Sequence, residues 1–214
     1  YTTAFSIASN KLDVTASGYD TYIFWNTAFG ADQEAYVTLS QVDGDASELD
    51  LLLKSQSNDS YGNGAILVYY DPLNNLVQVW TYDLSNGWVQ HGSNISVTFN
   101  NGDQFGARAK ANGDVEVYKN GALLATRNVS SWQYYASGGY IGMWLAEAAD
   151  ALLDDFGGGN VTTGPTPTLT ASPTQTFTST PTATPTHTSI SSPTGTAAQT
   201  ATNTNVPANT PTNT

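Results

Sequence analysis

The chain has 214 residues and a formal net charge of −12, and it contains no cysteine, which excludes disulfides and zinc–thiolate sites. An acidic surface repels phosphates, so we expect neither nucleic acid nor an anionic membrane surface as a partner. No apolar run approaches the roughly 18 residues of a membrane span, so we expect no membrane insertion.

Residues 1–160 predict an all-β fold. They show short alternating runs broken by Gly, Asn, Asp and Ser and almost no helical period, which is typical of antiparallel sandwiches and barrels. We expect about eleven or twelve strands. They fall within the segments 3–7, 11–16, 21–25, 34–42, 48–56, 64–71, 76–83, 87–91, 95–100, 104–111, 114–129, 138–147 and 151–159.

The alternation is clearest in residues 76–83. Because successive side chains of a strand point to opposite sides, each face of this segment carries its own set of residues. One face carries Val77, Val79 and Thr81, and the other carries Gln78, Trp80 and Tyr82. Within residues 114–129, Asn120 and Gly121 predict a two-residue hairpin turn, since both tolerate a positive φ.

The residues after 160 have a different composition. Eight of the nine prolines follow Gly164, among Thr, Ser, Ala and Asn, and no charged residue lies beyond 157. Such a segment cannot bury enough apolar surface to offset its ordering entropy. We therefore predict a β-sandwich over residues 1–160 and a disordered Thr/Pro-rich tail over 161–214, either an O-glycosylated stalk or a bare linker.

Three stretches resemble the concanavalin A-like lectin and glucanase superfamily, in particular its laminin-G-like jelly-roll modules of bacterial secreted proteins. They are the hairpin "VEVYKNGALLATRNV" and the closing strands "GGYIGMWL" and "LDDFGGG". The resemblance covers about residues 1–160 and implies a two-sheet antiparallel sandwich. It also places the protein outside the cell, secreted or on the cell surface. Because the chain begins at Tyr1 and ends within a repetitive tail, we expect it to be a piece of a longer protein.

Aromatic side chains are the best candidates for a binding surface. Sandwich proteins that bind sugars cover the apolar face of a pyranose with flat rings and pair its hydroxyls with amides and carboxylates. We expect strand pairing to gather one patch. Outside it, Trp144 is a weaker candidate: it alternates with Gly142, and a glycine in a strand can mark the close approach of a ligand or equally a bend. The patch residues are Tyr70, Gln78, Trp80, Tyr82 and Trp88.

Two pairs of carboxylates are candidates for calcium. Asp154 and Asp155 are adjacent on the last predicted strand, so alternation sends one of them inward, and the resemblance implies a structural calcium there. Asp43 and Asp45 form an oxygen-rich turn of the kind that calcium accepts. The alternative is that these carboxylates cap backbone amides or pair with an arginine.

A glycosidase needs two facing carboxylates, and enzymes of the resembled superfamily often carry them as Glu-x-Asp-x-Glu. Glu48 and Asp50 have this spacing, but Leu52 follows where a third carboxylate would be needed. We therefore expect no catalysis.

The leading interpretation is an extracellular carbohydrate-binding or adhesive module, tethered by its tail, with a polysaccharide or glycan as ligand. One alternative is a structural module of an extracellular assembly, whose partners are other domains of the parent chain or further copies of itself. The second is a glycoside hydrolase or polysaccharide lyase of the same fold.

Overall fold

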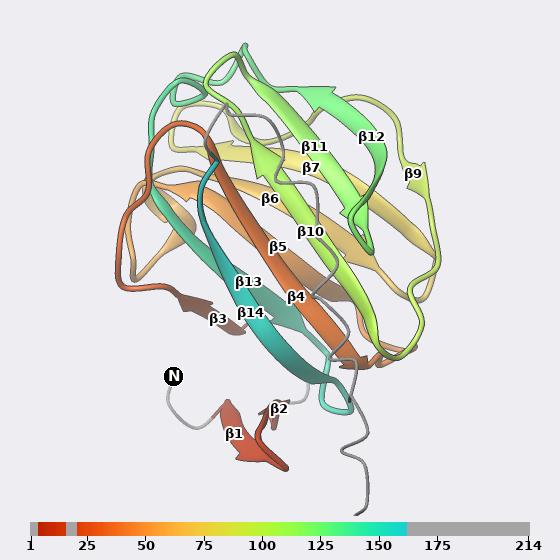
Figure 1. Cartoon of the computed structure of the whole chain (residues 1–214). Helices are drawn as coiled ribbons and strands as arrows, with labels where there is room; N and C mark the ends of the chain where they lie inside the picture. Colours follow the sequence, from red (N-terminus) through yellow and green to blue (C-terminus); the bar gives the residue numbers. More distant parts are fainter. Residues whose placement is uncertain (1–3, 16–20, 162–214) are drawn as a thin grey trace, which may run out of the picture. The chain divides into compact units, whose positions relative to one another are not determined.

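A computed structural model describes residues 4–15 and 21–161, and these form two antiparallel sheets (Figure 1). The A sheet contains, in spatial order, β1 (Phe5–Ala8), β2 (Lys11–Val14), β14 (Leu152–Asn160), β4 (Gln33–Gln41), β10 (Asp103–Ala109), β11 (Asp114–Lys119) and β12 (Ala122–Asn128). The B sheet contains β3 (Thr21–Phe24), β13 (Tyr140–Ala146), β5 (Glu48–Ser55), β6 (Ala65–Asp71), β7 (Leu76–Asp83) and β8 (Gly87–Gln90), with β9 (Ile95–Ser96) paired to β7. A single turn of 3₁₀ helix, η1 (Tyr61–Asn63), lies between β5 and β6.

The prediction of a two-sheet antiparallel sandwich is confirmed, and the expected strand count was too low. The described residues contain fourteen strands: the hairpin of residues 114–129 contains two, and each of the other twelve predicted segments contains one. No helix in this part of the chain is long or apolar enough to cross a membrane. The predicted tail, from residue 162 onward, lies outside the described residues.

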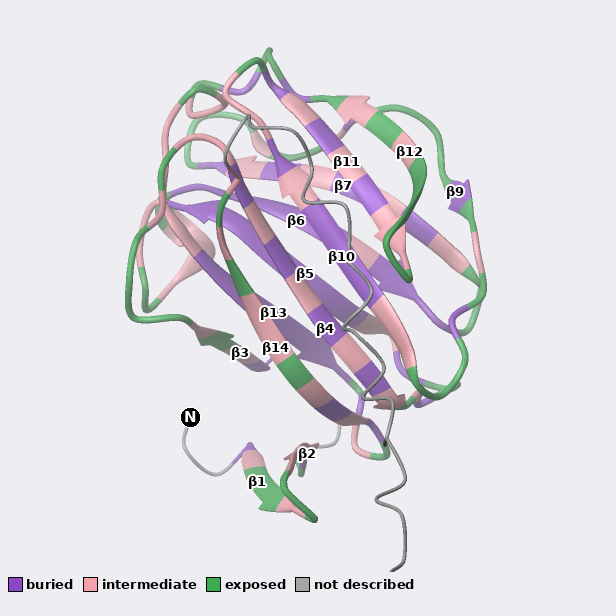
Figure 2. Cartoon of the chain, viewed as in Figure 1, coloured by how far each residue is buried: buried purple, intermediate pink, exposed green. Residues whose placement is uncertain are grey.

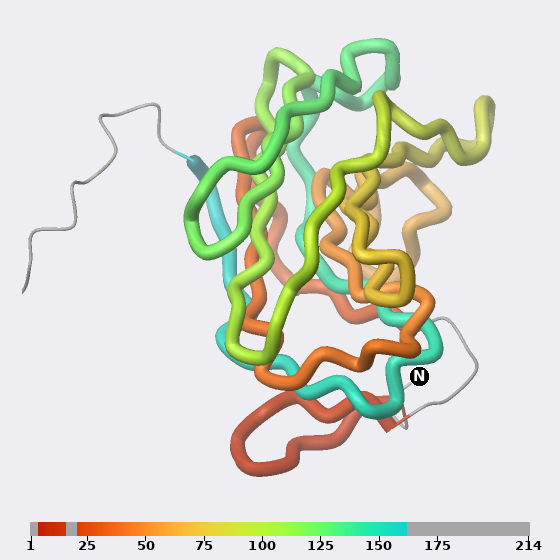
Figure 3. The backbone as a smooth tube through the Cα atoms, turned by 90° about the vertical axis from the view of Figure 1, so that its right-hand side faces the viewer, coloured from red at the N-terminus to blue at the C-terminus, as the bar shows by residue number. Residues whose placement is uncertain are grey.

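The core lies between the sheets, which face each other as two layers when the molecule is viewed from the side (Figure 3). Strand β4 alternates as the sequence predicts, with Ala35, Val37 and Leu39 buried and the residues between them less so (Figure 2). In β7, Val77, Val79 and Thr81 face the core. Period two therefore separates core from surface along both strands.

The hairpin at Asn120 and Gly121 is confirmed. Both residues have positive φ, 52° and 76°, and Lys119 pairs directly with Ala122. This backbone twists in the same sense as the two strands, so β11 and β12 continue without splaying.

Tyr70 belongs to the core, so its assignment to the binding patch was wrong. It is 1% exposed and packs against Phe99 and Phe105. Its hydroxyl accepts the backbone N–H of Phe99 at 3.1 Å. The reason is register: Tyr70 pairs with Val77, whose side chain also faces inward.

Lys54 is a fully buried cation at the end of β5. Its φ of 48° turns the side chain inward, where Nζ donates to the carbonyl oxygens of Lys110 at 2.9 Å and of Tyr135. Burial lowers the pKa of Lys54 to about 8, and the nearby carboxylate of Asp32 offsets part of that effect. The side chain thus ties β5 to two loops across the end of the sandwich.

Replacing Tyr70 with Phe should lower the free energy of unfolding by about 1–3 kcal/mol, because the buried N–H of Phe99 loses its acceptor. Urea unfolding measures this change. The matched control is Tyr69→Phe, on the outer face of the same strand, which should stay within about 0.5 kcal/mol of the wild type. Equal losses in both variants would contradict the core assignment.

Lys54 should also make stability depend on pH. Between about pH 8 and pH 10.5 the unfolded chain binds more protons at this lysine than the folded chain, so its contribution to the free energy of unfolding rises with pH. The difference in unfolding free energy between wild type and Lys54→Met should therefore move in favour of the wild type by up to about 3 kcal/mol across that window. A constant difference from pH 7 to pH 10, measured by urea unfolding, would refute the lowered pKa.

Candidate functional site

The outer face of the B sheet carries a hollow over Leu67, near its centre. Strand register places Phe24, Gly142 and Leu52 side by side, and Leu52 lies opposite Leu67, which lies opposite Trp80. Gly142 adds no side chain, and a Cβ there would lie 2.5 Å from the carbonyl oxygen of Ile23. Phe24 and β3 cover Gly142, and Leu67 is the aliphatic side chain that lines the hollow.

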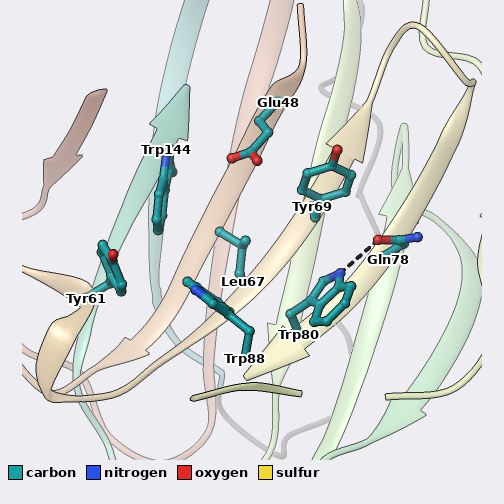
Figure 4. A pocket seen from close by; sticks show the side chains of 8 residues that line it. All are labelled: Glu48, Tyr61, Leu67, Tyr69, Gln78, Trp80, Trp88 and Trp144. Carbon is teal, nitrogen blue, oxygen red and sulfur yellow. Dashed lines mark hydrogen bonds between the residues drawn. The ribbon is translucent and has the colours of Figure 1, made fainter. Parts of the chain in front are cut away.

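Aromatic rings form the walls of a pocket of about 480 Å³ over Leu67, which we call the aromatic pocket (Figure 4). Its lining residues are Glu48, Tyr61, Leu67, Tyr69, Gln78, Trp80, Trp88 and Trp144. Trp144 and Tyr61 stand on one side, Trp80 and Gln78 on the other, and Trp88 closes the end between them.

The rings hold each other in place. Tyr61 has its ring centroid 4.5 Å from that of Trp144, 5.2 Å from that of Tyr82 and 5.5 Å from that of Trp88. Tyr82 and Trp88 pair across β7 and β8, with centroids 5.0 Å apart. Tilted and edge-on contacts of this kind stabilise aromatic clusters beyond their buried area.

Helix η1 supplies Tyr61 from a short loop. Ser60 caps it, since its Oγ accepts the backbone N–H of Gly62 at 3.0 Å. The chain leaves at Gly64 with φ 129°, where a Cβ would lie 2.8 Å from the ring of Tyr134. Capping and this glycine together fix Tyr61 over the sheet.

Polar groups of the pocket are oriented by hydrogen bonds. Trp80 Nε1 donates to Gln78 Oε1 at 2.8 Å, and Gln78 Nε2 donates to Asn94 Oδ1 at 2.9 Å. Asn94 Oδ1 also accepts from Gln90 Nε2 at 2.9 Å. Gln78 is thereby held with its amide along the pocket wall.

Trp144 has a donor without an acceptor. The residue is 6% exposed, and its Nε1 has no hydrogen-bond partner among the described residues. A buried indole N–H normally finds a partner, because leaving it unpaired costs free energy. The unpaired Nε1 is itself buried, so it lies beneath the surface of the pocket wall.

Negative charge surrounds Tyr69. Burial raises the pKa of its hydroxyl, and the carboxylates of Asp71, Asp50 and Glu48 raise it further. The hydroxyl therefore stays neutral over the physiological range and keeps its proton to donate. Figure 4 shows the Glu48 carboxylate at the rim of the pocket, between Trp144 and Tyr69.

Three of the five predicted patch residues, Gln78, Trp80 and Trp88, line the pocket, and Tyr82 supports it from behind Tyr61 and Trp88. Tyr70 lies on the opposite face of the sheet, in the core. Its neighbour Tyr69 takes the expected place, since it pairs with Gln78 across the hairpin. The sequence held a signal for this: directly paired residues share a face, and the short turn between β6 and β7 sets the register.

Three pocket residues escaped the predicted patch. Trp144 comes from β13, which lies beside β5 in the sheet although the two strands are far apart in the sequence. Its position therefore depends on the order of strands in the sheet, which local sequence patterns do not give. Tyr61 lies on a loop outside any alternating run, and no local signal locates it. The spacing of Glu48 and Asp50 indicates only an incomplete catalytic run, and it gives no sign that Glu48 lines a pocket.

The Asp43 turn is built by backbone capping. Asp43 Oδ1 accepts the N–H of Asp45 at 3.0 Å, and Oδ2 accepts the N–H of Asp150 at 3.1 Å. Asp45 itself is exposed. This arrangement matches the predicted alternative of amide capping, and calcium at this turn stays a prediction.

Neither Asp154 nor Asp155 points into the core, so the prediction of an inward carboxylate was wrong. The register of β14 against β4 shifts between Asp154 and Gly157, and Asp155 has φ 49°, which breaks the alternation. Asp154 Oδ2 lies 3.9 Å from Lys11 Nζ, and Asp155 is exposed. Within residues 4–15 and 21–161 no three His, Asp or Glu side chains gather as metal ligands. Calcium at these residues rests on the resemblance alone.

No known protein family matches the sequence, and no curated protein matches it either. Solved structures match in fold. The carbohydrate-binding module CBM66 from Bacillus subtilis is 12% identical, with a TM-score of 0.54 over 73% of this chain and 91% of that one. A Bacillus subtilis protein of unknown function with a galectin-like fold is 11% identical, with a TM-score of 0.53 over 73% and 86%.

A glycoside hydrolase family 16 endo-glucanase from Bacteroides ovatus is 12% identical, with a TM-score of 0.53 over 73% of this chain and 85% of that one. Identities this low relate the proteins by fold and not by activity. The predicted resemblance is confirmed at the level of fold: residues 4–15 and 21–161 form a two-sheet antiparallel sandwich similar to the folds of these solved structures.

Proposed function

We propose that the chain is a non-catalytic carbohydrate-binding module and that its glycan ligand occupies the aromatic pocket. The observation that carries the proposal is the pocket itself: rings of Tyr61, Trp80, Trp88 and Trp144 around the apolar side chain of Leu67. Pyranose rings have an apolar face, and aromatic side chains are the protein groups that cover such a face best.

The polar groups complement the rings. The Tyr69 hydroxyl is a donor for sugar oxygens, and the Glu48 carboxylate is an acceptor for sugar hydroxyls. A few fixed polar groups in a mostly apolar pocket are typical of sites that orient a small ligand. The similarity in fold to a carbohydrate-binding module and to an endo-glucanase supports the same class of ligand.

The carboxylates of β5 do not form a hydrolytic pair. Glu48 is the one carboxylate that lines the pocket, among the residues that the structure describes. Asp50 is 2% exposed, and its Oδ1 accepts the backbone N–H of Tyr70 at 2.9 Å. Leu52, where the third carboxylate of a Glu-x-Asp-x-Glu run would be, is fully buried in a cluster with Leu67 and Trp144. This arrangement supports a site that holds a sugar.

A binding module of this kind fits an extracellular setting. The Thr/Pro-rich residues 161–214 would act as a stalk or linker that holds the module away from a cell surface or from further domains of a longer protein. The acidic, cysteine-free composition is compatible with that setting.

Replacing Trp88 with Ala should weaken glycan binding by at least about tenfold, because the end wall of the pocket is lost. The full chain is screened against an array of glycans and polysaccharides, with and without calcium, and the retained ligands are titrated by calorimetry. Trp88 is 38% exposed, so the thermal midpoint should fall by only a few degrees.

Trp25→Ala is the matched control for that variant. Trp25 is 48% exposed and contacts Phe156, away from the pocket lining. It should leave glycan binding unchanged. If the folded wild-type chain binds no glycan on the array, or if both variants lose binding equally, the aromatic pocket is excluded as a glycan site.

Incubation of the full chain with the polysaccharides that it retains should release no new reducing ends, since the pocket lacks a second facing carboxylate. A reducing-sugar assay measures this. Release that disappears in a Glu48→Gln variant would show that the domain is a glycosidase after all.

A further inference from the structure

We infer that the glycan site extends past Trp80 onto an amide shelf, formed by Gln78, Gln90 and Asn94, which binds a further sugar unit of the same chain. This inference rests on the proposed function and names the class of ligand: neutral oligosaccharide chains rather than single sugars. Three features lead to it: the position of the shelf, the order of its side chains and the hydrogen-bonding groups that it leaves unused.

The shelf lies beside the aromatic pocket, on the far side of Trp80. Trp80 pairs with Leu67 of β6 on one side and with Gln90 of β8 on the other, and directly paired residues share a face of the sheet. Asn94 precedes β9, whose pairing with β7 brings it next to Gln78. Figure 4 shows the Gln78 amide beside the Trp80 ring, at the edge of the pocket. The outer face of the B sheet therefore continues past the pocket as a polar surface.

The distance between pocket and shelf suits consecutive sugar units. Leu67 and Gln90 stand on strands two apart in the sheet, which puts them about 10 Å from each other. This distance is longer than one pyranose ring, so a sugar over Leu67 leaves the shelf open to its neighbour in the chain. Trp80 lies between the two positions.

Hydrogen bonds hold the shelf in one arrangement. Asn94 Oδ1 accepts from both Gln78 Nε2 and Gln90 Nε2, each at 2.9 Å, and Gln78 Oε1 accepts from Trp80 Nε1 at 2.8 Å. Long side chains on a surface lose rotamer freedom when they are ordered, and here that loss occurs before any ligand binds. The shelf is therefore preorganised together with the ring of Trp80.

The shelf keeps hydrogen-bonding groups for a ligand. A primary amide has two N–H donors and one carbonyl acceptor, and Gln78 and Gln90 each use one of their two donors. Within the described residues, the side-chain nitrogen of Asn94 and the side-chain oxygen of Gln90 make no hydrogen bond. Asn94 is exposed and Gln90 is partly exposed. Because sugar hydroxyls both donate and accept, this mixture of neutral donors and acceptors fits a neutral sugar unit.

The test uses the mono-, di- and trisaccharides of each neutral polysaccharide that the full chain retains on the array, with the glucose, xylose, mannose and galactose series as first probes. Titration should give at least about tenfold tighter binding of the trisaccharide than of the monosaccharide, because only the longer ligand reaches the shelf. In a ¹⁵N–¹H correlation spectrum, the side-chain amide signals of Gln90 and Asn94 should move with the trisaccharide and stay in place with the monosaccharide.

Gln90→Met separates the shelf from the pocket, because Gln90 lies outside the pocket lining and the change removes its amide at nearly constant length. It should lower the affinity for the trisaccharide about three- to tenfold and leave the affinity for the monosaccharide unchanged. Gln104→Met is the matched control, since it makes the same change on β10 of the A sheet, and it should alter neither affinity. Both glutamines are partly exposed, so both variants should fold as the wild type does.

The outcomes separate this inference from the proposed function. Equal affinities for monosaccharide and trisaccharide, both lost in Trp88→Ala, would overturn the extended site and leave the aromatic pocket as a glycan site. A trisaccharide preference that survives Gln90→Met in full, or Gln90 and Asn94 signals that do not move, would place the further sugar elsewhere and overturn the inference. Array binding restricted to charged glycans would overturn it as well. No binding of any glycan by the folded chain would remove both proposals.

Discussion

The structure depends on the antiparallel pairing of β6 with β7, which gives the B sheet two faces of different chemistry. Val77, Val79 and Thr81 close the core, and the residues between them carry the amide and the rings of the outer face. A shift of one residue in this register would bury Trp80 and expose the valines. The core and the aromatic pocket are therefore two consequences of one strand register.

The hollow of the pocket lies over Leu67 on that outer face, with tryptophans and tyrosines on both sides. Leu52 is buried in a cluster with Leu67 and Trp144. Gly142 is required for a packing reason, because β3 passes so close that no Cβ fits.

The sequence predicted the fold class, the segments that hold the strands, the Asn120–Gly121 turn and three lining residues of the pocket, because period two and turn chemistry are local signals. It failed where the outcome depended on register or topology. Tyr70 and Tyr69 differ by one position, and only the pairing of β6 with β7 decides which faces outward. Asp155 sits in a bulge that no alternation rule anticipates, and Trp144 reaches the pocket through a crossover between distant strands.

The five tryptophans allow a direct measurement of the central claim. Their indole N–H groups give separate signals in a ¹⁵N–¹H correlation spectrum, which can be followed while the best-retained oligosaccharide of the array is added to the full chain. The account predicts that the signals of Trp80, Trp88 and Trp144 move, while Trp25 and Trp132, which lie outside the pocket lining, stay in place. Movement confined to Trp25 or Trp132, with bound ligand, would place the site elsewhere and contradict the account.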